Sequence, residues 1–186
     1  MTEVEQTRRE QILATAAELF AARGFHGVSV VDIGSACGVS GPALYKHFVS
    51  KDAVLAEMLV AISEQLLSVG RARVDEATDG ADAITKLIDW HVDFALGQRA
   101  LIVVQDRDWM SLPDLAREQV RTLQREYVDL WAAQLQRVHS DMTLETARAQ
   151  AHAAFGLINS TPHSGLLANE AMRKLLVGMA RRALLT

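Results

Sequence analysis

The residues with the clearest chemical potential lie between positions 29 and 55, where small, polar and basic side chains recur at helical spacing. Ser29 is followed three residues later by Asp32, and this pair forms a capping-box pattern that predicts the start of a short helix. Gly38 comes next, and a glycine can take the positive φ that ends a helix and turns the chain. The pattern therefore predicts a short helix, a tight turn and a second helix.

The second helix is expected to begin at Ser40, with Pro42 in its first turn, where a missing N–H does little harm. Leu44 and Phe48 recur at helical spacing and are predicted to point into the core. A helix of about two turns is not stable alone, so its neighbours must hold it. Its outer face of small and basic side chains is suited to entering the major groove of DNA. That face consists of Ser40, Gly41, Ala43, Lys46 and His47.

This segment resembles the DNA-binding domain of the tetracycline-repressor (TetR) family of bacterial transcription regulators, over roughly the first third of the chain. The residues that carry the resemblance, at the spacing of that family, are Asp32-Ile33, Gly38-Val39-Ser40, Leu44-Tyr45, His47-Phe48, Ser50-Lys51 and Leu55. The sequence departs from the family pattern at Gly34, Cys37, Ala43 and Val49. Ala43 stands where the family usually has Thr or Ser, so the resemblance implies the loss of a hydroxyl contact to DNA.

By this resemblance, the helix that begins at Ser40 enters the major groove of an operator. Tyr45 and His47 resemble the phosphate contacts of the family, and Lys51 is expected to add its charge to a helix N-terminus near the phosphates. Lys46 is predicted to contact a base edge. The predicted DNA-binding residues are Ser29, Ser40, Gly41, Pro42, Ala43, Tyr45, Lys46, His47 and Lys51.

Composition limits the class of protein. The chain has 186 residues, of which 49% are hydrophobic, and a net charge of −4. Residues 1–52 carry five Lys or Arg and six Asp or Glu, so DNA affinity is expected to come from the local placement of charge. The single cysteine, Cys37, excludes an internal disulfide and fits a reducing compartment. With no signal peptide or membrane-spanning run recognised, the predicted location is the cytoplasm, with no membrane partner.

Six histidines raise the question of a metal or catalytic site. The sequence contains no HExxH motif, no Cys/His cluster, no GxSxG, no P-loop and no G-x-G-x-x-G. We therefore expect no metal ligands, no catalytic residues, no cofactor and no enzymatic activity. An enzyme or a small-molecule-binding protein without DNA binding stays open as an alternative, but it leaves the Tyr45, Lys46 and His47 cluster unexplained.

Apolar residues recur at helical spacing along the rest of the chain, which predicts an all-α fold of about nine helices. After a first helix capped by Thr7 and the two helices of the motif, the predicted helices cover residues 50–70, 81–97, 100–104, 111–138, 143–159 and 167–184. The predicted domains are a three-helix helix-turn-helix DNA-binding domain, residues 1–50, and a helical ligand-binding and dimerisation bundle, residues 51–186.

The resemblance also implies a ligand pocket between the helices that start at Ser50, Ala81 and Ser111. Aromatic and Met side chains on these helices favour a hydrophobic inducer. We predict a fatty acid or its coenzyme A thioester, with Arg107 near an acidic head group; a cationic or aromatic drug, in a regulator of drug efflux, is the alternative. The predicted ligand-binding residues are Met58, Ile62, Leu87, Trp90, His91, Phe94, Arg107, Leu123, Tyr127, Trp131, Phe155 and Asn159.

The last two predicted helices supply a homodimer interface by the same resemblance. One is rich in small residues that allow close backbone approach, and the other carries a stripe of Met and Leu. The predicted interface residues are Ala147, Ala151, Ala154, Met172, Leu175, Leu176 and Met179. The resemblance thus implies a repressor that binds a palindromic operator as a homodimer and leaves it when an inducer binds.

Overall fold

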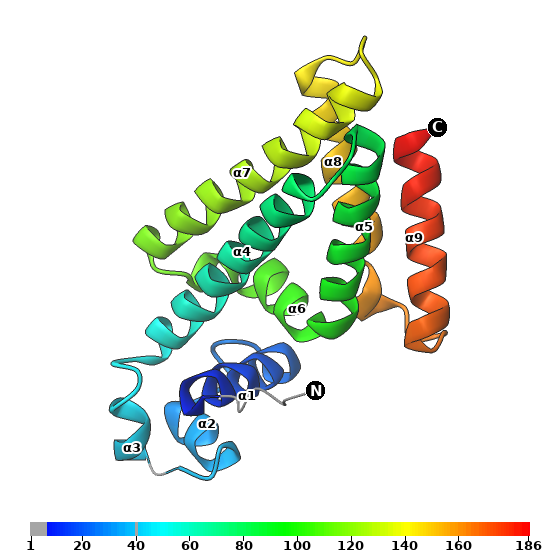
Figure 1. Ribbon diagram of the computed structural model, residues 1–186. Helices are drawn as coiled ribbons and strands as arrows, with labels where there is room; N and C mark the ends of the chain where they lie inside the picture. Colours follow the sequence, from blue (N-terminus) through cyan, green and yellow to red (C-terminus); the bar gives the residue numbers. More distant parts are fainter. Residues whose placement is uncertain (1–6, 40) are drawn as a thin grey trace. The chain divides into compact units, whose positions relative to one another are not determined.

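The computed structural model describes residues 7–39 and 41–186, and the side chains of all of these except residues 41 and 42. In these residues the chain forms α-helices, two short 3-10 helices and no β-strand, which confirms the predicted all-α fold (Figure 1). The α-helices are α1 (Arg8–Arg23), α2 (Val30–Ala36), α3 (Gly41–Tyr45), α4 (Lys51–Asp75), α5 (Gly80–Gly97), α6 (Arg99–Asp108), α7 (Asp114–Val138), α8 (Leu144–Ile158) and α9 (Asn169–Leu185). The 3-10 helices are η1 (Trp109–Ser111) and η2 (Thr161–His163).

The predicted helix starts in the N-terminal part are confirmed by their caps. Thr7 and Glu10 form a complete capping box at α1, and Ser29 and Asp32 form another at α2. Gly24 ends α1 with a φ of 78°, and its N–H donates to the carbonyl of Phe20 at 2.7 Å. These local hydrogen bonds fix where the first two helices begin and where the first one ends.

The fourth helix differs from the prediction, because α4 continues past Gly70 to Asp75. A Cβ at Gly70 would lie 2.7 Å from Cε2 of Tyr127 and 3.2 Å from Cδ2 of Leu130. Gly70 therefore allows α7 to pack closely on α4 and does not end the helix. Similarly, α9 begins at Asn169, two residues later than predicted.

Among the described residues, α4 is the one helix long and apolar enough to cross a membrane by length and composition. Of its most apolar stretch, 44% is buried inside the protein. Length and composition alone do not distinguish a membrane span from a helix that packs on other helices, and the buried side of α4 includes Leu55, Leu59 and Ile62.

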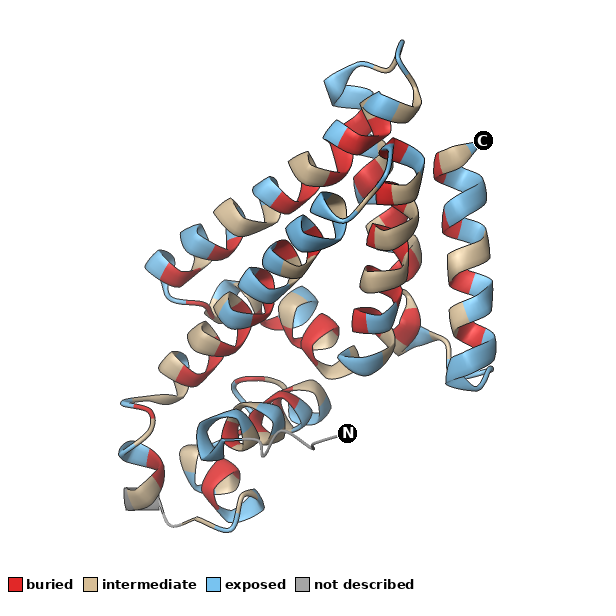
Figure 2. Ribbon diagram, in the orientation of Figure 1, coloured by how far each residue is buried: buried red, intermediate tan, exposed pale blue. Residues whose placement is uncertain are grey.

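The described chain divides into two compact units. One unit comprises the described residues up to Ala61 together with Ala100–Gln119, and the other comprises Ile62–Arg99 and Val120–Thr186. We call them the N-terminal unit and the C-terminal unit. Each has its own apolar interior, visible as the buried faces of its helices (Figure 2). The N-terminal unit buries Phe20, Ile33 and Leu55, and the C-terminal unit buries Trp131 and Leu135.

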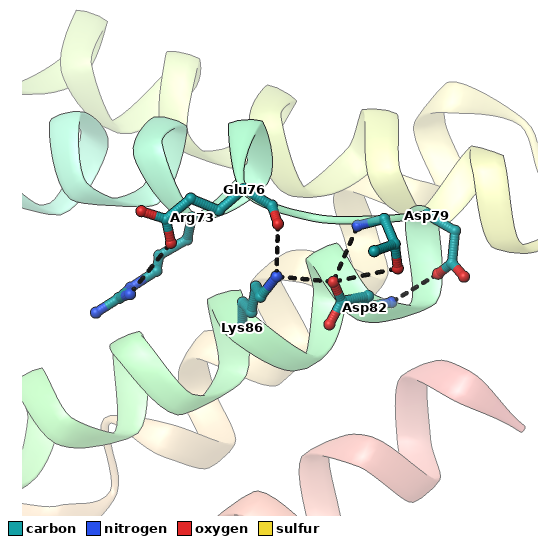
Figure 3. Close-up of polar contacts among 6 residues, drawn as sticks. Arg73, Glu76, Asp79, Asp82 and Lys86 are labelled. Atoms are coloured by element: carbon teal, nitrogen blue, oxygen red, sulfur yellow. Dashed lines mark hydrogen bonds and ion pairs between the residues drawn. The ribbon is translucent and has the colours of Figure 1, made fainter.

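Within the C-terminal unit, α5 packs against α8 and α9, and α8 packs against α9. The turn between α4 and α5 is held by Lys86, whose ammonium donates to the Glu76 carbonyl and to the Asp82 carboxylate, each at 2.8 Å (Figure 3). Asp79 caps α5 by accepting the Asp82 N–H at 2.8 Å. The pKa of Asp82 is lowered, first by its hydrogen bond from Lys86 and then by the backbone N–H of Thr78. The segment between α4 and α5 is thus a hydrogen-bonded turn.

Candidate functional site

The face predicted to read DNA is built by α2, α3 and the turn that follows α3. Leu44 and Phe48 are buried, whereas Tyr45 is 55% exposed and Lys46 is also exposed. The helix α3 ends at Tyr45, and the turn after it continues with the N–H of His47 donating to the carbonyl of Leu44 at 2.8 Å. Two apolar anchors therefore hold a segment whose Tyr45 and Lys46 side chains face solvent. We call Tyr45, Lys46 and the half-buried His47 the reading face.

The other predicted DNA-binding residues differ in their exposure and in whether their polar atoms already have hydrogen-bond partners. Ser40 lies outside the described residues, as do the side chains of Gly41 and Pro42. Ala43 is half-buried. Ser29 is exposed, but its hydroxyl accepts the Asp32 N–H at 3.1 Å and donates to the Asp32 carboxylate at 2.5 Å. The Ser29 hydroxyl is therefore occupied by the cap of α2.

Lys51 has partners within the protein. Its ammonium donates to the carbonyls of Phe25 at 2.7 Å and Val28 at 2.8 Å, and it lies 4.2 Å from the centre of the Phe25 ring. These contacts tie the first residue of α4 to the loop between α1 and α2. The structure thus gives the Lys51 ammonium two acceptors within the protein, and its contact to a phosphate stays a prediction.

Arg9 was not included in the predicted site, yet it holds the reading face in place. Its guanidinium donates to both carboxylate oxygens of Glu57 and to the carbonyl of His47, each at 2.5 Å. The same guanidinium lies 4.3 Å from the centre of the Phe48 ring. The hydrogen bonds that Arg9 donates to Glu57 raise the pKa of Arg9. Arg9 therefore connects α1 and α4 to the turn that carries His47.

Arg107 does not lie with the predicted ligand-binding residues of the C-terminal unit. It belongs to the N-terminal unit, where its guanidinium donates to the Ala21 carbonyl at 3.1 Å and to the Phe20 carbonyl, and pairs with the buried Asp108 at 3.1 Å. A positive charge at the C-terminal end of α1 also interacts favourably with the dipole of that helix. Arg107 thus caps the C-terminal end of α1, and its contact to a ligand head group stays a prediction.

Replacing Arg107 by alanine is expected to lower the free energy of unfolding by about 1–2 kcal/mol, since two charge-assisted hydrogen bonds are lost at a partly exposed site. Urea denaturation measures this change. The matched control is Arg181→Ala on α9, where the residue is exposed. Adding Asp108→Asn to Arg107→Ala should recover part of the loss, because it removes a buried carboxylate that has lost its partner. Equal denaturation midpoints for Arg107→Ala and the unmodified protein would contradict this role.

The C-terminal unit gathers five of the predicted ligand-binding residues into one cluster, which we call the His91 cluster. It consists of His91 from α5, Tyr127 and Trp131 from α7, Phe155 from α8 and Asn159 just after α8. One ring nitrogen of His91, Nδ1, lies 3.3 Å from the Tyr127 hydroxyl, and the other, Nε2, lies 3.1 Å from Oδ1 of Asn159. Both nitrogens of the imidazole therefore have partners.

The rings of this cluster have a regular arrangement. The Phe155 ring is stacked on His91 at 4.8 Å and on Tyr127 at 5.5 Å, with interplanar angles of 18° and 10°. Trp131 stands edge-on to Phe155 at 5.1 Å, with an interplanar angle of 87°. Offset-stacked and edge-to-face pairs are the favoured geometries of aromatic rings, so the cluster forms an ordered apolar wall.

Burial sets the charge state of the polar groups in this wall. It lowers the pKa of His91 to about 4, against a smaller opposing effect of the hydrogen bond with Asn159. Burial also raises the pKa of Tyr127, and the nearby Trp131 indole offsets part of that rise. The Trp131 N–H approaches the Tyr127 hydroxyl without the geometry of a hydrogen bond and has no other partner among the described residues. An unsatisfied buried donor costs about 1–3 kcal/mol.

The remaining predicted ligand-binding residues are distributed over both units. Met58 belongs to the N-terminal unit, and Ile62, Leu87, Trp90, Phe94 and Leu123 belong to the C-terminal unit. Phe94 contacts His91 edge-on, with 5.7 Å between ring centres. The indole N–H of Trp90 donates to the Leu66 carbonyl at 3.3 Å, so this indole is occupied. Among these described residues, Phe94 is the one whose ring packs against a ring of the His91 cluster.

Most of the predicted dimer residues are buried within a single chain. Leu175 and Met179 are 44% and 38% exposed. The buried members of the predicted set are Ala147, Ala151, Ala154, Met172 and Leu176. The alanines of α8 lie on more than one side, and its exposed residues include the small Ala149, Ala153 and Gly156 together with His152. The assignment of the buried residues to a dimer interface stays a prediction.

No group of three or more His, Cys, Asp or Glu residues within the described part of the chain could hold a metal ion.

Comparison with known proteins gives two matches to family models. Residues 12–58 match the model described as bacterial regulatory proteins of the tetR family, and residues 77–184 match the tetracyclin repressor-like C-terminal domain. The HTH-type transcriptional regulator UidR of Escherichia coli K12 is 34% identical over 118 residues, which cover 62% of this chain and 58% of UidR. The chain thus spans somewhat more than half the length of this relative.

Solved structures with the same fold extend over nearly the whole chain. A TetR-family transcriptional regulator from Bordetella parapertussis 12822 aligns with a TM-score of 0.83 and 26% identity, covering 94% of both chains. The regulator FadR from Bacillus subtilis, in complex with stearoyl-CoA, aligns with a TM-score of 0.72 and 16% identity, covering 93% of this chain and 97% of that one. At that identity, the second likeness concerns the fold alone.

Proposed function

Since the chain belongs to the tetR family of bacterial regulatory proteins, we propose that it is a cytoplasmic repressor that binds a palindromic operator as a homodimer. The observation that carries the proposal is the reading face, in which the exposed Tyr45 and Lys46 directly follow the buried Leu44. Side chains fixed to a supported short helix can enter the major groove without large rearrangement. In this proposal residues 1–50 bind DNA, and residues 51–186 bind the ligand and the partner subunit.

Each residue of the reading face has a separate role. Lys46 carries a flexible ammonium that can donate to a base edge or to a phosphate. Tyr45 has a hydroxyl at the end of a rigid ring and contacts a phosphate. His47 is held through its backbone by Arg9, so its ring has a fixed starting position beside the groove. Because residues 1–52 carry only five Lys or Arg, each of these contacts contributes a large share of the affinity for DNA.

The inducer in this proposal is a hydrophobic small molecule that binds in the C-terminal unit. The apolar rings of the His91 cluster support this choice. The acyl-CoA bound to the structural neighbour FadR suggests an acyl-CoA or a fatty acid as the first compounds to test. A flat aromatic drug is the second candidate, because the stacked rings of Tyr127, Phe155 and His91 favour planar compounds.

Replacing Lys46 by alanine is expected to weaken binding to an operator obtained by selection from random duplexes by about 5- to 100-fold. Loss of one contact to the nucleic acid should also reduce the slope of log affinity against log salt by about one. Fluorescence anisotropy at three salt concentrations measures both quantities. Arg73→Ala is the matched control, since Arg73 is an exposed cation paired with Glu76 at the end of α4. Equal effects of the two substitutions would contradict the assignment of Lys46.

A further inference from the structure

The polar atoms of the His91 cluster are buried in an apolar wall and carry no charge. His91 is 3% exposed, Tyr127 4% and Trp131 fully buried. His91 and Tyr127 share a hydrogen bond, and His91 and Asn159 share another. The groups that face His91 are Tyr127 and Trp131 from α7, Phe155 and Asn159 from the α8 segment, and Phe94 from α5 itself.

Two features of this cluster concern a ligand directly. The Trp131 N–H is a buried donor that interacts with the Tyr127 hydroxyl but completes no hydrogen bond among the described residues. The described side chains in ring or hydrogen-bond contact with His91 include no carboxylate and no ammonium or guanidinium group, and no charged group shifts the pKa of His91. A ligand group that enters this cluster must therefore accept a hydrogen bond and bring no charge of its own.

We propose that the inducer presents an uncharged carbonyl group to the Trp131 and Tyr127 side of the His91 cluster, on a flat or apolar frame. The carbonyl is that of a ketone, an ester or a thioester. This inference rests on the proposed function and specifies the chemistry of the compound that the C-terminal unit recognises.

The same contacts disfavour a ligand that brings a negatively or positively charged group into the cluster. A carboxylate would need a cation beside it, and His91 stays neutral because burial opposes its protonation. Arg107, the predicted partner of an acidic group, is occupied by the carbonyls of Phe20 and Ala21. A cationic ligand would need a carboxylate, which the side chains that face His91 do not include. The aromatic rings of the cluster can stack on the planar part of a neutral ligand, whichever carbonyl group the ligand carries.

Four compounds with the same naphthalene frame test the proposal on the full-length protein: 2-acetylnaphthalene, 2-naphthoate, protonated 2-naphthylmethylamine and 2-ethylnaphthalene. Isothermal titration calorimetry at pH 7.5 should give the ketone at least about tenfold tighter binding than each of the other three compounds, because only the ketone satisfies a buried donor without bringing a charge. Titrations in two buffers of different ionisation enthalpy should show no proton uptake when the ketone binds. Tighter binding of the naphthoate, with uptake of a proton, would overturn the proposal.

Variants locate the contact. Trp131→Phe should remove the preference for the ketone over 2-ethylnaphthalene, while Trp90→Phe, whose indole bonds to the Leu66 carbonyl, should keep it. Tyr127→Phe, which removes only a hydroxyl, should also reduce the preference and serves if Trp131→Phe does not fold. An unchanged preference in Tyr127→Phe and in any folded Trp131→Phe, or no binding of any of the four compounds at 1 mM, would also overturn the proposal.

Operator binding is measured on the same samples without ligand. Intact operator binding together with failed ketone binding rejects this inference alone. Ketone binding without operator binding leaves the inference standing and rejects the proposed regulator.

Discussion

Replacing both Leu175 and Met179 by glutamate is expected to produce a monomer and to lower operator affinity by at least about 100-fold. Both side chains are partly exposed on one side of α9, 44% and 38% respectively. The neighbouring outward side of α8 carries small exposed residues, and a Cβ at Gly156 would meet no described atom within 4 Å. Two packed copies of these helices would bury the apolar side chains, whereas four new carboxylates would repel across the symmetry axis.

The size of the effect follows from the two half-sites of a palindrome. A dimer presents two reading faces at once, so the second face binds at high effective concentration, which contributes about 10²- to 10⁴-fold to the affinity. Sedimentation velocity measures the mass, and anisotropy with a selected operator measures the affinity. Leu115→Glu is the control, because Leu115 is 85% exposed and lies in α7 outside this surface. A double variant that stays dimeric would contradict the proposed interface.

Lowering the pH from 7 to 5 is expected to remove about 2 kcal/mol of the free energy of unfolding through His91 alone. The native-state pKa of His91 is lowered to about 4 by burial, while the unfolded chain binds a proton with a pKa of about 6.5. Below pH 6.5 the unfolded state therefore binds more protons than the native state, and stability falls as the pH falls towards 4. Above pH 6.5 both states are neutral at this position, and the contribution is fully present.

Urea denaturation at pH 7, 6 and 5 and at one protein concentration tests this pH dependence. His91→Phe is expected to be less stable at pH 7, because Tyr127 and Asn159 lose their partner, yet its stability should depend on pH about 2 kcal/mol less than that of the unmodified protein. His163→Gln, at an exposed position, is the control and should follow the unmodified protein. Parallel curves for His91→Phe and the unmodified protein would show that the imidazole is not held neutral.

Much of the fold could be predicted because its boundaries are set by local hydrogen bonds. The caps at Thr7 and Ser29 need only residues three positions away, and the stop at Gly24 needs only its own φ. Gly70 was misread as a stop because its real partner, Tyr127, lies far away in the sequence. The sequence alone does not distinguish a glycine that ends a helix from one that leaves room for a ring of another helix.

The site was predictable to the extent that its residues follow helical spacing. Leu44 and Phe48 were predicted to be buried from their helical spacing, and they are buried. The bonds of Lys51 and Arg107 to backbone carbonyls were not predictable, because the sequence pattern does not show where such acceptors lie. The role of Arg9 was missed because its partner Glu57 is 48 residues away in the sequence.

Which residues of α8 are buried was also not readable from the sequence. Alanines occur at Ala147, Ala151 and Ala154, which are buried, and at Ala149 and Ala153, which are exposed. Because small residues occur on both sides of α8, the sequence shows no difference in hydrophobicity that would separate the buried side from the exposed side. The burial of each residue in the folded chain was needed to separate the two.

The most direct test of the central claim, that the reading face recognises DNA, is selection of random duplexes by the unmodified protein and by a Tyr45→Ala, Lys46→Ala double variant. Both side chains are exposed, so the double variant is expected to fold. The unmodified protein should enrich an inverted repeat with half-site centres about 34–36 Å apart, or a related spacing, and the double variant should enrich none. Enrichment of no sequence by the unmodified protein, or of the same repeat to the same degree by both proteins, would contradict the claim.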